Sequence, residues 1–314
     1  MASCHSDDLL KEVFMHTVCR LKFQPVTAED IAVIAPYFEG KRAGICDMSA
    51  LYLHMCGDAL GMEYAVHDDV LFLRRNNKYG ISYYPPLLRG ECALAKGLPY
   101  LSVLEEERVR LCSIPAHETE AFERACRVLK KGTSRRWADY IYRAVDLATL
   151  QGHRYNKKRN LVHQFERLYP VHTYEEISPE NIGDVVDFMH RFMAEGEMSE
   201  DKQYENRRVL GVLADYDRLP VVGGIVRVEG QLAAFTVAEE IDDMLVVHVE
   251  KADRSFKGAY QYINYRFVRE CMQKRELHLV NREDDAGDEG LRQAKLSYCP
   301  VDILHKYHMV IDNK

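Results

Sequence analysis

The chain has 314 residues, enough for two domains that each bury a core, and its 47% hydrophobic and 29% charged residues are those of an ordinary globular protein. Its net charge of −7 argues against nucleic-acid wrapping over the whole surface, and no segment reaches the roughly 20 apolar residues of a membrane-spanning helix. The first residues do not form a secretory signal and the nine cysteines occur singly, as reduced thiols do, so we expect a cytoplasmic protein.

The first half of the chain gives weak element signals. The apolar pattern predicts a strand, a helix, a hairpin and a late helix, at 21–26, 28–38, 62–75 and 117–131 respectively. Two consecutive prolines, Pro85 and Pro86, exclude their segment from the middle of a sheet.

Residues 124–167 concentrate positive charge. Twelve lysines and arginines against three acids give this segment a net charge of +9, so the rest of the chain carries −16. The cations are interleaved with aromatic residues, namely Trp137, Tyr140, Tyr142 and Tyr155. Because cations neutralise phosphates and aromatic rings stack on unpaired bases, we expect this segment to contact the acceptor end of a tRNA, with Lys157 and Arg159 binding substrate. A solvated basic face is the alternative.

The second half has a distinctive element order. Periodicity predicts a strand, two helices, a three-stranded antiparallel meander, a helix, a strand, a short helix and a last strand, at 171–177, 180–196, 204–219, 221–250, 259–275, 277–281, 288–298 and 304–311. This is the order of the GNAT acyltransferase fold, in which the fourth strand and the following helix diverge to make an acyl-donor cleft. The first half is a weaker echo of it.

We therefore predict an α+β protein of two tandem GNAT-like domains, each a mixed, mostly antiparallel sheet flanked by helices. The predicted domains are residues 1–145 and 146–314, and the second carries the better-defined cleft.

The stretch "HVEKADRSFKGAY", His248 to Tyr260, lies at the strand-to-helix junction of the second domain. GNAT-like chemistry needs a base that takes a proton from the incoming amine. Side chains alternate along a strand, so His248 and Glu250 should share one face. Glu250 is the first candidate base and His248 the second, and an ion pair or a core hydrogen bond is the alternative role of each. Tyr298 falls where many GNAT enzymes carry a tyrosine that protonates the leaving group.

The loop "RSFKGA" partly matches the GNAT phosphate-binding pattern R/Q-x-x-G-x-G/A. Arg254 and Ala259 are in register, whereas Lys257 takes the central glycine position and Gly258 follows it. A helix N-terminus with added cations attracts phosphate, so these four residues are the candidate donor site. Lysine in place of glycine weakens the case for coenzyme A and suits a tRNA phosphate at least as well. An ordinary polar helix start is the alternative.

The acidic loop 281–290 follows the predicted fifth strand. Asn281, Glu283 and Asp285 are candidates for holding the ammonium of an amino acid or a polyamine. The alternative is a solvated turn with Asp288 as the N-cap of the next helix. The acid spacing does not match a calcium-binding loop, so we expect no metal.

Three segments carry a resemblance to a known family: "DYIYRAVDLATLQGHRYNKKRNLVHQF" (139–165), "HVEKAD" (248–253) and "VNREDDAGDEGLRQAKLSYCP" (280–300). There the sequence resembles the soluble bacterial group related to the C-terminal domain of phosphatidylglycerol lysyltransferase, and before about residue 110 the resemblance is faint. It implies tandem GNAT domains similar to Fem-type peptidyltransferases, which take an amino acid from aminoacyl-tRNA. With no membrane-embedded half expected, a lipid acceptor is not simply implied.

The expected activity is transfer of an acyl or aminoacyl group from aminoacyl-tRNA or acyl-coenzyme A to an amine or hydroxyl. That acceptor is a small molecule or a lipid headgroup, and we expect no tightly bound cofactor. The alternative is a non-catalytic GNAT-like module that binds a phosphorylated or aminoacylated ligand. An open gap between the fourth and fifth strands, with Glu250 facing it, would favour the enzyme. The sequence leaves the donor, the acceptor and the oligomeric state open.

Overall fold

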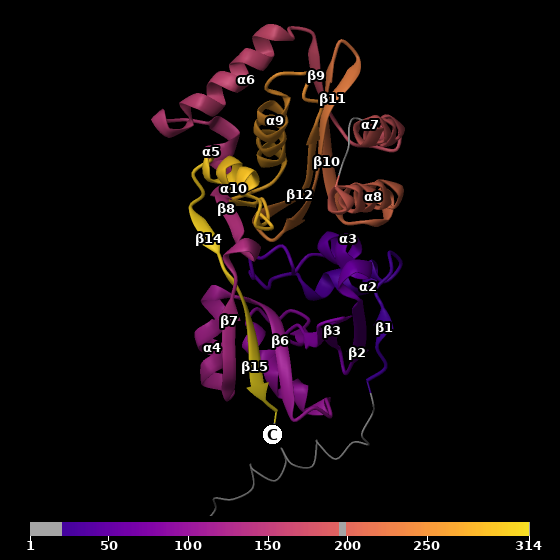
Figure 1. Ribbon diagram of the computed structural model, residues 1–314, viewed down its shortest axis with the longest axis vertical. Helices are drawn as coiled ribbons and strands as arrows, with labels where there is room; N and C mark the ends of the chain where they lie inside the picture. Colours follow the sequence, from indigo (N-terminus) through magenta and orange to yellow (C-terminus); the bar gives the residue numbers. More distant parts are fainter. Residues whose placement is uncertain (1–20, 195–198, 314) are drawn as a thin grey trace, which may run out of the picture.

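The computed structural model describes residues 21–194 and 199–313. Residues 1–20, with the segment expected not to be a signal, and the last two residues of the helix predicted at 180–196 lie outside this range. Two mixed sheets flanked by helices lie one above the other along the long axis (Figure 1). Among the described residues, no helix is both long and apolar enough to cross a bilayer.

The first sheet has the order β1-β2-β3-β4-β6-β15-β7, with β5 paired to β3. Its strands are β1 Gln24–Pro25, β2 Met62–His67, β3 Val70–Asn77, β4 Gly80–Tyr83, β5 Leu87–Leu88, β6 Arg108–Pro115, β7 Val128–Thr133 and β15 Lys306–Asp312. The helices of this domain are α2 Ile31–Ile34, α3 Ala50–Leu60 and α4 Thr119–Ala125, with a 3₁₀ segment, η2, at Leu94–Val103.

The second sheet has the order β14-β8-β13-β12-β11-β10-β9. Its strands are β8 Asp139–Arg143, β9 His172–Glu176, β10 Val221–Val228, β11 Gln231–Ile241, β12 Met244–Ala252, β13 Leu279–Asn281 and β14 Asp302–Leu304. Its helices are α5 Ala144–Thr149, α6 Asn156–Leu168, α7 Ile182–Ala194, α8 Glu200–Ala214, α9 Ala259–Lys274 and α10 Glu289–Leu296. Helices α7 and α8 cover one face and α9 the other (Figure 1).

The predicted fold class is confirmed: the protein is α+β with two tandem GNAT-like domains. The hairpin predicted at 62–75 is β2 and β3, and the predicted meander is β10, β11 and β12. The helix predicted at 259–275 is α9. These elements follow from local signals, because an alternating or helical apolar pattern depends on neighbours in sequence.

In the first half, one prediction is corrected and one helix was missed. The late helix at 117–131 is wrong in its second part: α4 ends at Ala125, Cys126 is extended, and Val128–Thr133 forms β7. That strand pairs with β15, which lies far along the chain, so the local pattern of residues 128–133 does not reveal its partner. Helix α3 was not predicted, although Ser49 caps its N-terminus and Gly61, with φ +58°, ends it in the left-handed conformation that glycine favours.

Each sheet contains a strand from the other half of the chain. β15, at the C-terminal end, lies between β6 and β7 of the first sheet, although the strand predicted at 304–311 was assigned to the second domain. β8, which precedes residue 145, lies between β13 and β14 of the second sheet. A domain boundary at residue 145 therefore separates β8 from the rest of the second sheet and β15 from the rest of the first.

A buried ionic cluster lies where the exchanged strands begin. Lys306, the first residue of β15, places its Nζ 2.5 Å from Oδ1 of Asp47 and 2.8 Å from Oδ1 of Asp139, the first residue of β8. Asp47 also accepts hydrogen bonds from Arg75 and Ser113. Because removing one partner strands a buried charge, the cluster couples the two domains.

The N-terminus of α3 docks on the second sheet. The carboxylate of Glu239, on β11, accepts hydrogen bonds from the backbone amides of Ala50 (3.1 Å) and Leu51 (2.8 Å). A carboxylate at a helix N-terminus satisfies free amides and complements the helix dipole. This contact and the Lys306 cluster fix the first domain against the second.

Replacing Lys306 with methionine leaves the carboxylates of Asp47 and Asp139 without their shared cation. We expect this to lower the free energy of unfolding in urea by about 3–5 kcal/mol. The control is Lys130→Met on neighbouring β7, an exposed lysine whose replacement should change stability by less than about 0.5 kcal/mol. Equal losses in the two variants would contradict the role of the cluster.

Burial raises the pKa of Asp284, whose carboxylate lies 3.9 Å from Nζ of Lys306, to about 7. The unfolded carboxyl titrates near 4, so between pH 4 and 7 the folded chain holds a proton that the unfolded chain has lost. The stabilisation from this group is therefore lost as pH rises through 7.

Asp284→Asn should unfold at a higher temperature than the parent at pH 8 and at the same temperature at pH 4. The gain at pH 8 should be roughly 2–4 kcal/mol, since one pKa unit corresponds to about 1.4 kcal/mol. Thermal unfolding across this pH range measures it, with the exposed Asp217→Asn as control. A difference in unfolding temperature between Asp284→Asn and the parent that did not vary with pH would contradict the raised pKa of Asp284.

Candidate functional site

The parallel strands β12 and β13 pair briefly and then separate. Met244–Val246 pair with Leu279–Asn281, and beyond Val246 no described residue of β13 pairs with β12. β12 continues to Ala252 while it remains paired with β11 on its other side. The separation predicted for the fourth and fifth strands is therefore present.

A β-bulge in β12 changes which residues face the gap. Val247 pairs with Ala238 and Val249 with Val237, so His248 is an extra residue. As a result Val247 packs in the core on the α9 side and Val249 in the core that includes α7 and α8. The prediction that His248 and Glu250 share a face is wrong, because alternation fails at a bulge.

Glu250 lies in the gap and bridges it. Its Oε1 accepts a hydrogen bond from Nη2 of Arg282, just after β13, at 2.9 Å, and its Oε2 accepts one from Nδ2 of Asn264, on α9, at 3.0 Å. The side chains of Glu250 and Arg282 are each 13% exposed. An ion pair therefore joins the two strands where their backbone ladder has ended.

Tyr298 and Lys158 complete the lining of the gap. The Arg282 guanidinium lies 4.9 Å from the centre of the Tyr298 ring, and Nζ of Lys158 lies 4.2 Å from the same ring centre. Burial raises the pKa of Tyr298, and burial together with the nearby Arg282 lowers that of Lys158. The gap thus holds one carboxylate, two cations and a phenol.

Two polar atoms in this gap are buried without a hydrogen-bond partner among the described residues: Nη1 of Arg282 and Oδ1 of Asn264. Leaving such a group unpaired costs about 1–3 kcal/mol. One is a donor and the other an acceptor, and both flank Glu250. The gap therefore has unused hydrogen-bonding capacity of both kinds.

The neighbours of Lys158, Lys157 and Arg159, which were predicted to bind substrate within the tRNA-contacting segment, lie outside the gap. Lys157 is exposed, and Arg159 donates to the carbonyl of Leu150 at 2.6 Å and to Asn156, which fixes its own loop. The sequence analysis singled out Lys157 and Arg159 and did not predict that Lys158, between them, lies against Tyr298 in the gap. Residues 157–159 lie in the first turn of α6, and the direction of each side chain depends on the packing of that helix.

His248 lies between the domains instead of in the gap. Its side chain is fully buried, with Nδ1 2.8 Å from Oε1 of Glu283 and Nε2 3.3 Å from Oγ of Ser49. Burial opposes ionisation of Glu283, but the hydrogen bond with His248 holds its pKa below the ordinary value. His248 therefore has the geometry of a hydrogen-bonded core histidine, which was the alternative to a catalytic role.

The other residues of the acidic loop are engaged within the protein. Asn281 donates to Asp139 and to the carbonyl of Gly44, and fully buried Asp285 pairs with Arg292 and Tyr140. Asp288 accepts a hydrogen bond from the amide of Leu291 and so caps the N-terminus of α10, which was the alternative predicted for this loop. These contacts organise the turn after β13.

Several hydrogen-bond donors of the predicted phosphate loop already have acceptors within the protein. The amide and hydroxyl of Ser255 both donate to Oδ1 of Asp253, and the amide of Lys257 donates to the Tyr169 hydroxyl. Gly258, with φ +89°, lies under α6, where a Cβ would be 2.6 Å from the carbonyl oxygen of Leu161. Ala259 is buried, while Arg254 and Lys257 are exposed. Few loop donors remain for a pyrophosphate.

The aromatic residues of the basic segment separate by burial. Tyr140, Tyr142 and Tyr155 are at most 1% exposed and belong to the second core, whereas Trp137 is 48% exposed. Three of the four rings expected to stack on bases are therefore core residues.

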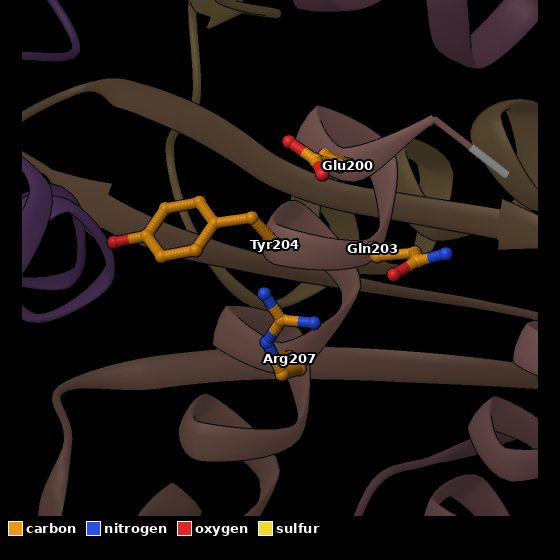
Figure 2. A pocket seen from close by; sticks show the side chains of 4 residues that line it. All are labelled: Glu200, Gln203, Tyr204 and Arg207. Atoms are coloured by element: carbon orange, nitrogen blue, oxygen red, sulfur yellow. The ribbon is translucent and has the colours of Figure 1, made fainter.

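A hollow of about 400 Å³ lies on α8, where Figure 2 shows Glu200, Gln203, Tyr204 and Arg207 projecting from one helix. Its lining carries one acid and one base, so it has no excess charge for an ionic ligand.

Comparison with known proteins places the chain in a family. The family described as phosphatidylglycerol lysyltransferase, C-terminal, matches residues 40–310. A conserved protein of unknown function from Bacteroides thetaiotaomicron VPI-5482 superposes with a TM-score of 0.81 at 31% identity, over 93% of this chain and 99% of that one.

More distant structures share the fold alone. L-PGS from Bacillus licheniformis has a TM-score of 0.61 at 12% identity, covering 91% of this chain and 92% of its own. FemX has a TM-score of 0.56 at 10% identity, covering 92% of this chain and 97% of its own.

One sequence relative is an uncharacterized protein, MYCGA3080, from Mycoplasmoides gallisepticum. It is 24% identical over 172 residues, which span 54% of each chain, so only about half the length of that relative is matched.

The family match covers most of the chain and includes β8, most of β15 and the separated strands β12 and β13. The protein therefore belongs to the phosphatidylglycerol lysyltransferase C-terminal family.

Proposed function

We propose that this protein is an aminoacyltransferase, which moves an aminoacyl group from an activated ester to an amine or hydroxyl held between β12 and β13. The observation that carries the proposal is the separation of these strands around Glu250, with a buried donor and a buried acceptor left unpaired beside it. The family name and the fold of L-PGS and FemX agree with a transferase at this coarse level.

The groups of the gap suit attack on an ester carbonyl. Glu250 accepts the proton of the incoming amine, once the substrate replaces part of its contact with Asn264 or Arg282. The edge of β12 beyond Val246, which β13 has left, presents backbone to the acyl group, and the guanidinium of Arg282 stabilises the developing oxyanion. Tyr298, kept protonated by its raised pKa, donates a proton to the leaving group.

The geometry favours an RNA carrier over coenzyme A as the donor. The loop at 253–259 uses its own acid and a tyrosine hydroxyl as acceptors, where a pyrophosphate would need those amides. Lys157 and the other exposed cations of residues 124–167 offer a basic approach for a tRNA acceptor end. The acceptor of the aminoacyl group in this proposal is an amine or hydroxyl of a small molecule or of a lipid headgroup.

A non-catalytic binding module is the second candidate. The observation in its favour is that both oxygens of Glu250 already have partners, as in a structural ion pair. Such a module would bind the donor without turnover, so a transfer assay separates the two functions.

Glu250→Gln should lower the rate of aminoacyl transfer at least about 100-fold, because a general base contributes about 10²–10⁴-fold. The assay supplies a mixture of labelled aminoacyl-tRNAs, with small amines and vesicles containing phosphatidylglycerol as acceptors, and measures labelled product. The matched control is Glu205→Gln, an exposed acid that pairs with Lys251 on β12. Unchanged transfer in Glu250→Gln would remove the base assignment, and donor binding without turnover by the parent protein would establish the module.

Charge reversal at Lys157 should weaken binding of uncharged tRNA roughly fivefold to tenfold and reduce its salt dependence, because phosphate contacts release counterions. Calorimetric titration of the parent with coenzyme A should show no binding. The control is Lys96→Glu, an exposed cation of η2 outside the basic segment. Tight coenzyme A binding that is lost in Arg254→Glu would reverse the choice of donor.

A further inference from the structure

A groove of about 660 Å³ lies on the first domain, apart from the residues that line the β12–β13 gap. It is bounded by the C-terminal end of α3, the turn between β3 and β4, strand β6, and the indole of Trp137 from the segment before β8. Its volume is within the range of about 300–1,000 Å³ that is usual for small-molecule sites.

The charged residues that line this groove are all cations, Arg75, Lys78 and Arg110, although the whole chain carries −7. Nη1 of Arg110 donates to the carbonyl of Tyr79 at 2.9 Å, and Nζ of Lys78 lies 5.2 Å from the centre of the Tyr79 ring. Within residues 21–194 and 199–313 neither Lys78 nor Arg110 forms an ion pair. Two unneutralised cations that line the same groove favour an anionic ligand.

Arg75 supplies a fixed cation at the inner side of the groove. Its described hydrogen bonds all use Nη2, which donates to Asp47, to the Tyr84 hydroxyl and to Oγ of Ser113. Its Nε is buried with no partner among the described residues. The groove is thus built on a side chain held rigidly by the interdomain cluster.

Two aromatic rings border the same groove and remain open to solvent. Trp137 is 48% exposed and Tyr79 is 77% exposed. The guanidinium of Arg136 lies 4.4 Å from the centre of the Trp137 ring, which supports the indole from its own loop. An exposed indole beside cations is the arrangement on which a nucleobase stacks while its phosphate is neutralised.

From these contacts the geometry points to a nucleotide-binding site in this groove, with the phosphate on Lys78 and Arg110 and the base against Trp137. The ligand is a free mononucleotide or the end of a single-stranded RNA, since both present the same chemistry. This inference goes beyond the proposed acyl transfer and does not depend on it, because none of the groove residues lines the gap.

Trp137 is the one tryptophan of the sequence, so its fluorescence reports directly on the groove. We expect AMP or CMP to quench this fluorescence saturably, with matching calorimetric titrations, and adenosine, cytidine and inorganic phosphate to bind at least about tenfold more weakly. A ribotrinucleotide distinguishes the sources: tighter binding than the mononucleotides indicates a strand end, and equal binding indicates a free nucleotide. Both results support the site.

The double variant Lys78→Gln/Arg110→Gln should weaken nucleotide binding at least about tenfold, and Trp137→Leu should leave nucleotides binding no better than phosphate. The control, Arg89→Gln/Lys96→Gln, removes two exposed cations that lie elsewhere on the first domain, outside residues 124–167, and should bind as the parent does. Glu250→Gln should also bind normally, which separates this site from the acyl-transfer proposal. Absence of binding, equal binding of phosphate, or binding unaffected by the groove variants would overturn the inference.

Discussion

The ion pair between Lys306 and Asp139 is the constraint on which the arrangement of the two domains depends. Each residue is the first of a strand that has crossed into the sheet of the other half, and the pair is buried at the crossover. A buried cation must have its anions, so the ends of β8 and β15 are held together, and Asp47 attaches the first domain to the same point. From there the contacts of Asn281 with Asp139 and Gly44 fix the end of β13, which is the strand that leaves β12. The interdomain cluster thus positions one wall of the candidate site.

Each domain contains a pair of parallel strands that pair briefly and then separate, and the two separations are lined by different residues. In the first, the parallel strands β4 and β6 share one register pair, and the leucines of η2 are buried in the core beside them. Gly97 allows η2 to approach so closely that a Cβ would lie 1.9 Å from the carbonyl oxygen of Pro86. In the second domain the corresponding separation is lined by Glu250, Arg282 and Asn264. Leucines of η2 pack beside the first separation and the cation there, Arg75, pairs with Asp47, whereas the second separation is lined by Glu250, the candidate base, which is why the proposed chemistry is placed in the second domain.

Several residues of the candidate site were identified from the sequence, and the errors have physical causes. Glu250 and Tyr298 were found because they follow from the position of the fourth strand and of the helix after the acidic loop, and both line the gap. His248 was misplaced because one extra residue in β12 reverses the alternation. Arg282, Asn264 and Lys158 were missed because an arginine in a loop, an asparagine in a helix and a lysine in a basic run look the same whether they face solvent or a gap.

The sequence by itself determined the α+β class, the junction that carries Glu250 and, apart from the short strand β14, the order of the main helices and strands from about residue 171 onward, because periodicity and turn residues act between near neighbours. Only the tertiary structure decided which strands pair across the chain, as when Lys306 meets Asp47, 259 positions away. It also decided that Tyr140, Tyr142 and Tyr155 are core residues while Trp137 is exposed. The reason is the same in each case: burial and long-range pairing depend on which surfaces come together, and the local pattern of residues does not encode that partner.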